Sequence, residues 1–313
     1  MDIKIPKNHN DFLKLIDKID TELKKRNVPI YGRPIEAARE FAKKLKIEIK
    51  LGPNCQAIPN RYDGDSLAGH IYEWYQKRYG ERLKINFSPG SAAIIIRGDV
   101  WKINTPRVFG VVRLTSDRVL DKYPAIKKAT FGPNPPIYNI LRSIEGFPSD
   151  LALTLNNSEL AHILSFAKYL LDTLHIIEYL RGKKLPLISE AKADYDSAVS
   201  YIFMLPPQYG LSKWGSLQFI EKLLKCFLSI KGVGLLKTHE LKKLSVLAQE
   251  NGLPILSKSS IEKVQCSAGV RYGENVFTLE EAVDAHHASL IICNVIVVEI
   301  MKLVSEKAKN ITK

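Results

Sequence analysis

The chain has 313 residues, of which 45% are hydrophobic, and a formal net charge of +13 at pH 7. This length and apolar content are enough for two folded domains of ordinary size, and they exclude a disordered or low-complexity protein. The excess of positive charge favours polyanionic partners, because binding phosphates releases condensed counterions.

Three helices are predicted in the first 80 residues, over 10–26, 34–45 and 65–79. In the first of these segments Phe12, Ile16 and Ile19 recur at helical spacing, with Asn10 or Asp11 as the N-cap. Proline suits the first turn of the second helix, and Gly80 ends the third. Residues 46–51 alternate like a strand between the second and third helices.

After residue 82 the apolar residues take the spacing of strands. The runs 83–87, 92–97, 100–103 and 108–114 are short and rich in β-branched residues, and Gly98-Asp99 indicates a hairpin turn. Residues 1–130 are therefore predicted to form a basic α+β domain, in which helices precede a small antiparallel sheet.

A proline-rich segment at 131–148 marks the predicted boundary between domains. It contains Pro133, Pro135, Pro136 and Pro148, which lack backbone donors and have a fixed φ. Beyond it, residues 149–313 are predicted to form an all-α helical bundle. Its longer helices are expected over 158–181, 189–205, 212–230, 239–251, 257–268 and 279–307.

The sequence predicts a cytoplasmic protein that does not span a membrane. The apolar run 288–304 is interrupted by Asn294 and Glu299, and it is shorter than the roughly 20 residues that a span needs. The amino-terminal residues lack the apolar core of a signal peptide. The four cysteines are too far apart for a Cys-x-x-Cys element and are expected to be reduced thiols. No motif for a metal or another cofactor is present.

Positive charge is concentrated in the first half of the chain. Residues 1–150 contain 27 Lys+Arg and 17 Asp+Glu, a balance of +10, whereas residues 151–313 contain 19 and 16, a balance of +3. Cations beside aromatic rings suit single-stranded nucleic acid, whose phosphates pair with cations and whose bases stack on rings. The predicted nucleic-acid contacts are Arg97, Trp101, Lys102, Arg107 and Arg113 on the strands, with Lys77, Arg78 and Arg82 near the third helix. The alternative is a solvated sheet face with Trp101 in the core.

Several short motifs in the second half of the chain occur in a recognisable order. They are Glu221-Lys222 followed by Leu224 and Lys225, then Thr238-His239-Glu240-Leu241, then Arg271-Tyr272, and then a helix that begins near Glu280. Over about residues 190–305 this order resembles the HEPN domain, a helical bundle of prokaryotic nucleotide and RNA metabolism. The resemblance implies a homodimer formed through the bundle and a role in prokaryotic defence, toxin–antitoxin control or stress regulation.

The pair of residues typical of HEPN ribonucleases is missing. Members with that activity have an arginine followed four to six residues later by histidine, and none of the seven histidines here has an arginine at that spacing. The resemblance therefore implies a non-catalytic dimerisation or binding module, and the predicted function is the binding of nucleic acid or a nucleotide. One alternative is a metal-independent endoribonuclease with a nonstandard site formed by His239, Arg271 and His286. The other is an adaptor that binds an acidic protein partner.

Overall fold

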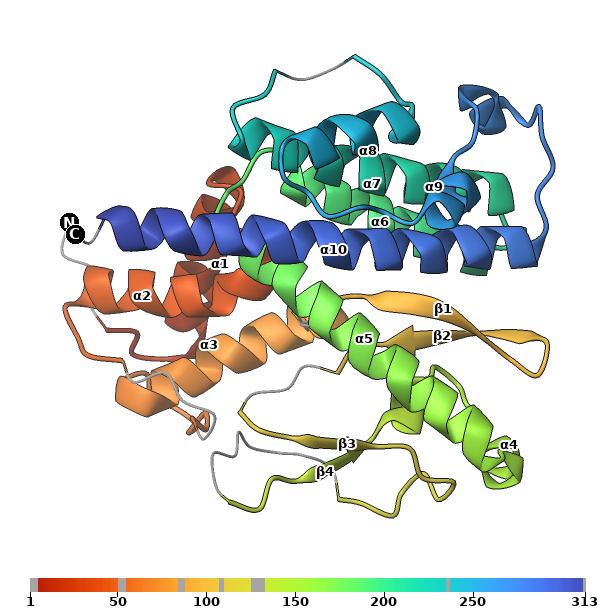
Figure 1. Cartoon of the computed structure of the whole chain (residues 1–313). Helices are drawn as coiled ribbons and strands as arrows, with labels where there is room; N and C mark the ends of the chain where they lie inside the picture. The colour runs from red at the N-terminus through yellow and green to blue at the C-terminus, as the bar shows by residue number, and fades with distance from the viewer. Residues whose placement is uncertain are drawn as a thin grey trace. The chain divides into compact units, whose positions relative to one another are not determined.

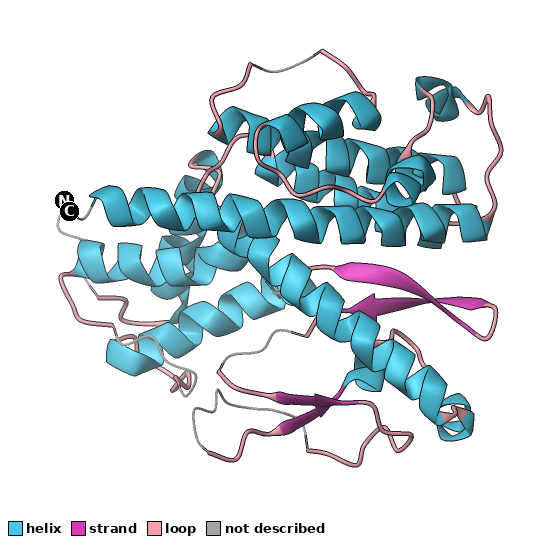
Figure 2. Ribbon diagram, viewed as in Figure 1, coloured by secondary structure: helices cyan, strands magenta, loops and turns pink. Residues whose placement is uncertain are grey.

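A computed structural model describes residues 5–49, 55–83, 88–106, 110–124, 133–234 and 237–311. The chain divides into two compact units, Met1–Phe87 (unit 1) and Ser88–Lys313 (unit 2) (Figure 1). Each unit has a hydrophobic core of its own. Helices make up most of the described structure, as Figure 2 shows by colour.

The described part of unit 1 forms three helices, α1 (His9–Lys25), α2 (Arg33–Leu45) and α3 (Gly64–Tyr79), with 3-10 turns at Ile30–Gly32 and Gly80–Leu83. The three predicted helices are confirmed to within one residue at every end. Their apolar faces meet around Phe12, Ile16, Phe41 and Tyr75. The actual N-cap of α1 is Asn8, whose side chain accepts from the Asp11 N–H.

The strand predicted at 46–51 is not formed in its described part. Helix α2 ends at Lys46, which takes the left-handed conformation with φ 56°. Residues 47–49 have no regular structure, and residues 50–51 lie outside the described residues. Alternation over so few residues did not predict a strand reliably, because pairing also needs a partner strand.

A close approach of backbones fixes the start of α3 to the segment that precedes it. The Ser66 hydroxyl accepts from the Ile58 N–H at 2.9 Å and donates to the Arg61 carbonyl at 2.8 Å. One turn further on, Gly69 lies against Ala57 with no space for a side chain, since a Cβ there would stand 2.3 Å from the Ala57 nitrogen. The absence of a side chain at residue 69 therefore allows this packing.

Unit 2 begins with the predicted hairpin. Strands β1 (Ser91–Ile96) and β2 (Asp99–Asn104) pair antiparallel, with Ile96 opposite Asp99. The turn is therefore Arg97-Gly98, one residue earlier than predicted, and both residues have positive φ, 52° and 87°. Positive φ at both central residues matches the twist of the flanking strands.

The remaining strands differ from the predicted antiparallel sheet. Strand β3 (Arg113–Thr115) pairs parallel with β4 (Ile137–Asn139), in a separate two-stranded sheet. Strand β3 lies at the end of the predicted run 108–114, and residues 107–109 are outside the described residues. Strand β4 was not predicted, because three residues after two prolines carry no measurable alternation.

The described part of the proline-rich segment, residues 133–148, is folded as part of unit 2. Within 133–148 the chain forms β4 and a 3-10 turn at Ile140–Ser143, and Ile140, Leu141 and Ile144 are buried in the core of unit 2. The Pro136 carbonyl accepts from the Arg113 N–H at 2.9 Å. Proline precedes the strand, where a missing donor costs little. The described division lies between residues 87 and 88, because the strands share a core with the later helices.

The helical bundle that was predicted after residue 149 is present. Its helices are α4 (Ser149–Thr154), α5 (Asn157–Arg181), α6 (Ile188–Phe203), α7 (Tyr209–Ile230), α8 (Leu241–Glu250), α9 (Lys258–Val264) and α10 (Leu279–Ile311), with a 3-10 turn at Ala268–Tyr272. Helix α7 packs against α6, α8 and α10. Helix α10 runs along the length of the bundle, and α5 crosses it on the side of the hairpin (Figure 1).

Two helices of unit 2, α5 and α10, are long and apolar enough to cross a membrane by length and composition. Their most apolar windows are 39% and 44% buried within the protein. Core helices of folded proteins pass the same test, so these values are weak evidence of a membrane span. In α10, Asn294 donates to the Thr173 hydroxyl of α5 at 3.0 Å, a polar contact between the two helices.

Candidate functional site

Two of the cations predicted on the strands, Arg97 and Lys102, are engaged by carboxylates of the protein itself. Arg97 Nε lies 2.7 Å from Glu159 Oε1, and its terminal nitrogens donate to Glu159 Oε2 at 3.0 Å and to the Thr154 hydroxyl at 2.8 Å. Lys102 lies 3.4 Å from Glu145. The bidentate pairing of Arg97 with Glu159 occupies the guanidinium donors that a phosphate would need.

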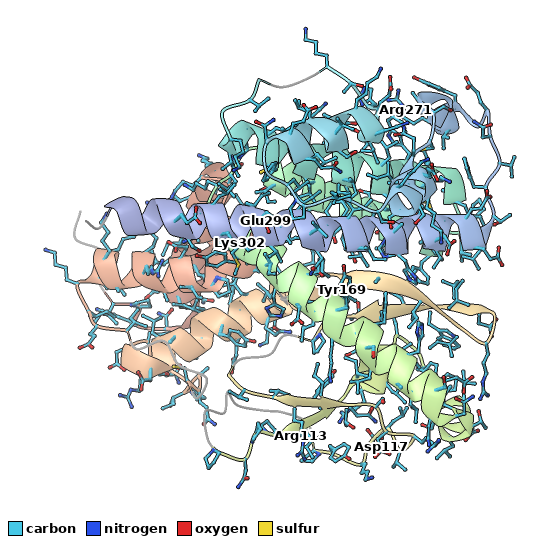
Figure 3. The ribbon with its side chains drawn as sticks, in the orientation of Figure 1. Arg113, Asp117, Tyr169, Arg271, Glu299 and Lys302 are labelled. Carbon is cyan, nitrogen blue, oxygen red and sulfur yellow. The ribbon has the colours of Figure 1, made fainter. Side chains whose placement is uncertain are left out.

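The aromatic residue of the predicted strand surface belongs to the core. Trp101 packs edge-on against Phe147 with ring centroids 5.0 Å apart, and its indole nitrogen is buried. Arg107 lies outside the described residues. Arg113 is exposed, but it lies far from Arg271 on the opposite side of unit 2 (Figure 3). The described strand residues therefore fit the alternative reading, a solvated sheet face with Trp101 inside.

The second predicted cluster, near the end of α3, has its cations at the surface and some of its aromatic rings in the core of unit 1. Lys77, Arg78 and Arg82 are exposed, whereas Tyr75 is fully buried. Arg78 lies 4.8 Å from the Trp74 ring centroid and 3.2 Å from an Asp17 carboxylate oxygen. The cations of this helix therefore face solvent, while Tyr75 packs in the core. One of the three cations, Arg78, is paired with Asp17.

His286 is excluded as a catalytic residue by its position. Its side chain is fully buried beside Tyr195, with ring centroids 5.3 Å apart, and neither ring nitrogen has a hydrogen-bond partner among the described residues. Burial, together with a smaller contribution from the neighbouring His287, lowers the pKa of His286 from 6.5 to about 3. The neighbouring His287 approaches the Ala93 carbonyl at 2.7 Å. The two histidines therefore pack α10 against α6 and β1.

One face of α7 brings several polar side chains together. Trp214, Gln218, Glu221 and Lys225 recur at intervals of three or four residues, which places them on one side of the helix. Polar side chains at this spacing are typical of a solvated helix face, but Glu221 is only 4% exposed. A buried carboxylate requires partners, because removing its charge from water is costly.

Glu221 has three such partners. Lys225 lies 2.7 Å from Oε1, while Gln218 donates to Oε2 at 3.0 Å and His239 Nδ1 lies 2.7 Å from the same oxygen. The side chain of His239 is 65% exposed. A carboxylate on Nδ1 fixes the orientation and tautomer of the imidazole and leaves Nε2 facing outward.

Arg271 lies beside two aromatic rings, those of Trp214 and Tyr272. Its guanidinium carbon is 4.8 Å from the Trp214 ring centroid and 5.4 Å from that of Tyr272, and the His239 and Trp214 centroids are 6.1 Å apart. No carboxylate of the described residues lies within ion-pair distance of Arg271. Tyr272 is 76% exposed. We call Trp214, His239, Arg271 and Tyr272 the Arg271 surface.

Gln265 connects the two segments that carry this surface. Its side-chain oxygen accepts from the Leu241 N–H at 2.9 Å, and its nitrogen donates to the carbonyls of Cys266 at 3.1 Å and His239 at 3.5 Å. The start of α8 and the segment that leads to Arg271 are thereby held together.

The alternative ribonuclease site groups His239, Arg271 and His286. His239 and Arg271 both lie beside Trp214, whereas His286 is buried in the core. That grouping missed Trp214, Glu221 and Gln265 as parts of the site. The spacing of Trp214, Gln218, Glu221 and Lys225 on one helix face was a visible signal, whereas the burial of Glu221 depends on segments far along the chain.

Comparison with known proteins gives no relative: no family model, no curated protein and no solved structure matches the chain.

Proposed function

We propose that the protein binds single-stranded nucleic acid or a nucleotide through the Arg271 surface, with a HEPN-like helical bundle as the binding module. The observation that carries this proposal is the state of Arg271. Its guanidinium carbon lies 4.8 and 5.4 Å from the centroids of two aromatic rings, and no described carboxylate neutralises it. Arg97, by contrast, is neutralised by Glu159.

The chemistry of the surface suits a phosphate with an adjoining base. An arginine held by stacking presents its donors to a phosphate in a fixed fork, which lowers the entropy lost on binding. The exposed ring of Tyr272 offers a face for a base, and stacking on an aromatic side chain contributes roughly 1–3 kcal/mol. His239 adds a further polar group at the same surface.

The charge of both units supports encounter with a polyanion. Residues 1–87 contain 18 Lys+Arg and 12 Asp+Glu, a balance of +6, and residues 88–313 contain 28 and 21, a balance of +7. A positive field on each unit raises the rate of association with nucleic acid at low salt.

The order of motifs between residues 190 and 305 supports a HEPN-like module on the resemblance alone. On that basis we also propose a homodimer through the bundle, a cytoplasmic location and a role in prokaryotic defence, toxin–antitoxin control or stress regulation.

Binding of a labelled single-stranded oligonucleotide tests the proposal. We expect fluorescence anisotropy to show binding that weakens steeply as salt rises, because the contacts are to phosphates. Arg271→Ala should lower the affinity about tenfold, the loss expected for a hydrogen-bonded charged group. Tyr272→Ala should lower it by a similar factor, since a stacking partner is lost.

Arg97→Ala is the matched control for this experiment, because it removes an equal charge from an arginine that Glu159 already engages. We expect it to leave affinity unchanged. An equal loss in both arginine variants would contradict the assignment to the Arg271 surface. Absence of binding at low salt would refute the function itself and would favour the acidic protein partner.

A second function, metal-independent cleavage of RNA, is favoured by the pairing of His239 with Glu221. A histidine oriented by a buried carboxylate, with its second nitrogen exposed, has the arrangement of a general acid or base. We expect any cleavage of labelled RNA in the presence of a chelator to fall at least about 100-fold in His239→Ala, which loses the proton-transfer group. His162→Ala, which changes an exposed histidine of α5, is the control. RNA that stays intact through long incubation with the unmodified protein would exclude this activity.

A further inference from the structure

The outward face of α5 carries three ionisable side chains of different kinds. Lys168, Asp172 and His175 recur at i, i+4 and i+7, and all three are exposed. Leu170 and Leu174, on the opposite side of the helix, are buried in the core of unit 2. No ion pair or side-chain hydrogen bond joins any of the three to another described residue. Asp172 and Lys168 have the spacing of a helical salt bridge but do not form one.

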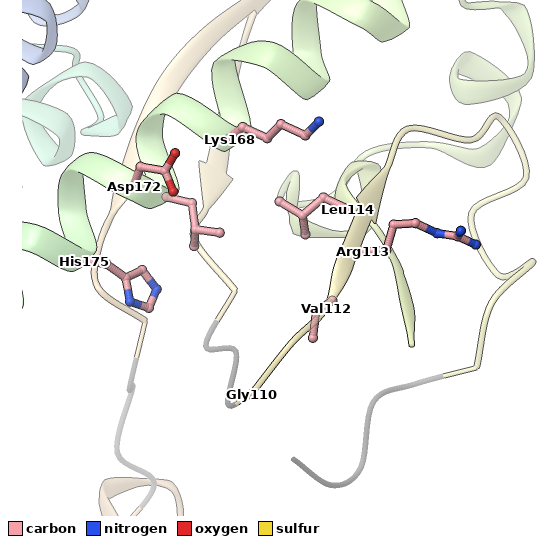
Figure 4. Close-up of a pocket in the computed structure, with 8 residues that line it drawn as sticks. Gly110, Val112, Arg113, Leu114, Lys168, Asp172 and His175 are labelled. Carbon is pink, nitrogen blue, oxygen red and sulfur yellow. The ribbon is translucent and has the colours of Figure 1, made fainter. Parts of the chain in front are cut away.

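These side chains line an open cavity of about 630 Å³, and the segment from Gly110 to Leu114 lies across it. Figure 4 shows Asp172 and His175 directed into the space, and Leu114 directed toward it from β3. Arg113 is directed away, on the other face of the strand. All of these residues belong to unit 2.

The two sides of the cavity do not complement each other. A strand laid over a helix is normally held by apolar side chains from both elements. Here Val112 and Leu114 are only half-buried, and they stand opposite an ammonium, a carboxylate and an imidazole. Contact between the apolar side chains of the strand and the ionisable side chains of α5 stabilises neither, because apolar groups form no hydrogen bonds with charged groups. A molecule with polar groups on one side and an apolar body on the other would satisfy both.

We propose that this cavity binds a small organic anion that also carries hydroxyl or amino donors, of the size of a nucleoside monophosphate. Lys168 pairs with the anionic group, Asp172 accepts from the hydroxyl or amino donors, and His175 contributes a further hydrogen bond. Leu114 and Leu171 cover the apolar body. The volume lies within the range of roughly 300–1,000 Å³ typical of ligand sites and exceeds what a bare phosphate fills. This site shares no residue with the Arg271 surface.

Titration with adenosine 5′-monophosphate tests this site. We expect isothermal titration calorimetry on the full chain to show binding, and NMR spectra of the histidine rings to show a shift of His175. Lys168→Ala and Asp172→Asn should each weaken binding about tenfold, because each removes a charge-assisted hydrogen bond. Both residues are exposed on a helix, so thermal unfolding of the variants serves as a check that they are folded.

Three further measurements complete the test. Adenosine alone and inorganic phosphate alone should each bind more weakly than the monophosphate, and phosphate that binds equally well would contradict the proposed ligand class. Arg271→Ala removes any binding of the monophosphate at the Arg271 surface, so the His175 shift and the weakening by Lys168→Ala should both persist in this variant, and their loss would overturn the proposal. Absence of binding at millimolar concentration, or binding that neither α5 variant changes, would also overturn it. Asp172→Asn should leave oligonucleotide binding unchanged, so this site and the proposed function can fail separately.

Discussion

Replacing Gly69 with alanine is expected to destabilise unit 1 by about 3 kcal/mol or more, a loss typical of severe overpacking. The added Cβ would stand 2.3 Å from the Ala57 nitrogen and 2.4 Å from the Gln56 carbonyl carbon. Both are backbone atoms, so no side-chain rotation relieves the clash. The segment before α3 would have to move away, which would break the hydrogen bonds between Ser66 and that segment.

Hydrogen exchange of the α3 amides and urea unfolding measure this effect. Gly32→Ala is the matched control in the same unit, because its Cβ would meet only a Val28 methyl group at 3.8 Å, an ordinary contact. Its residue has φ −86°, which alanine adopts readily. We expect the control to unfold at the same urea concentration as the unmodified protein or higher. Equal stability of both variants would show that residues 55–57 do not pack on α3 as described.

The helices could be predicted closely from the sequence, because their signal is local. In α1, Phe12, Ile16 and Ile19 repeat with the period of the helix, and the core they form requires that period. The hairpin could be predicted for the same reason, from two β-branched runs around a glycine. Strand β4 and the division at residues 87 and 88 depend on pairing and packing with distant segments, so spacing within the segment did not reveal them.

The site was harder to predict, because its chemistry depends on which charges become neighbours. The sequence around Arg97 indicates a cation that is free to bind a phosphate, because its partner Glu159 lies 62 residues further along the chain. Glu221 has the spacing of a solvated residue, yet His239 covers it from a segment 18 residues away. The alternative of a nonstandard ribonuclease site grouped His239, Arg271 and His286, whereas it did not include the tryptophan that His239 and Arg271 approach. Residue types therefore indicated which side chains could bind a phosphate, and the tertiary structure determined which of them are not paired within the protein.

Acid is expected to destabilise unit 2 through His286. The pKa of His286 is about 3 in the folded protein, where burial and then His287 disfavour the charged form, and its usual value is 6.5. Below pH 6.5 the His286 imidazole is protonated in the unfolded chain but stays neutral in the folded protein. The free energy of unfolding therefore falls as pH drops from 6.5 toward about 3. At pH 5 His286 lowers the free energy of unfolding by about 2 kcal/mol, because each pH unit below the unfolded-state pKa costs about 1.4 kcal/mol.

His286→Leu tests this linkage, because leucine has a similar volume and does not titrate. We expect urea unfolding to show stability at pH 7 equal to or above that of the unmodified protein, since two unpaired buried nitrogens are removed. Between pH 7 and pH 5 the variant should lose about 2 kcal/mol less than the unmodified protein. Burial also lowers the pKa of His287, so part of the acid dependence should remain in the variant. His175→Gln, at an exposed position of α5, should leave the dependence unchanged. A pH profile that His286→Leu does not flatten would mean that the residue is solvated, which would contradict the packing of α10 against Tyr195.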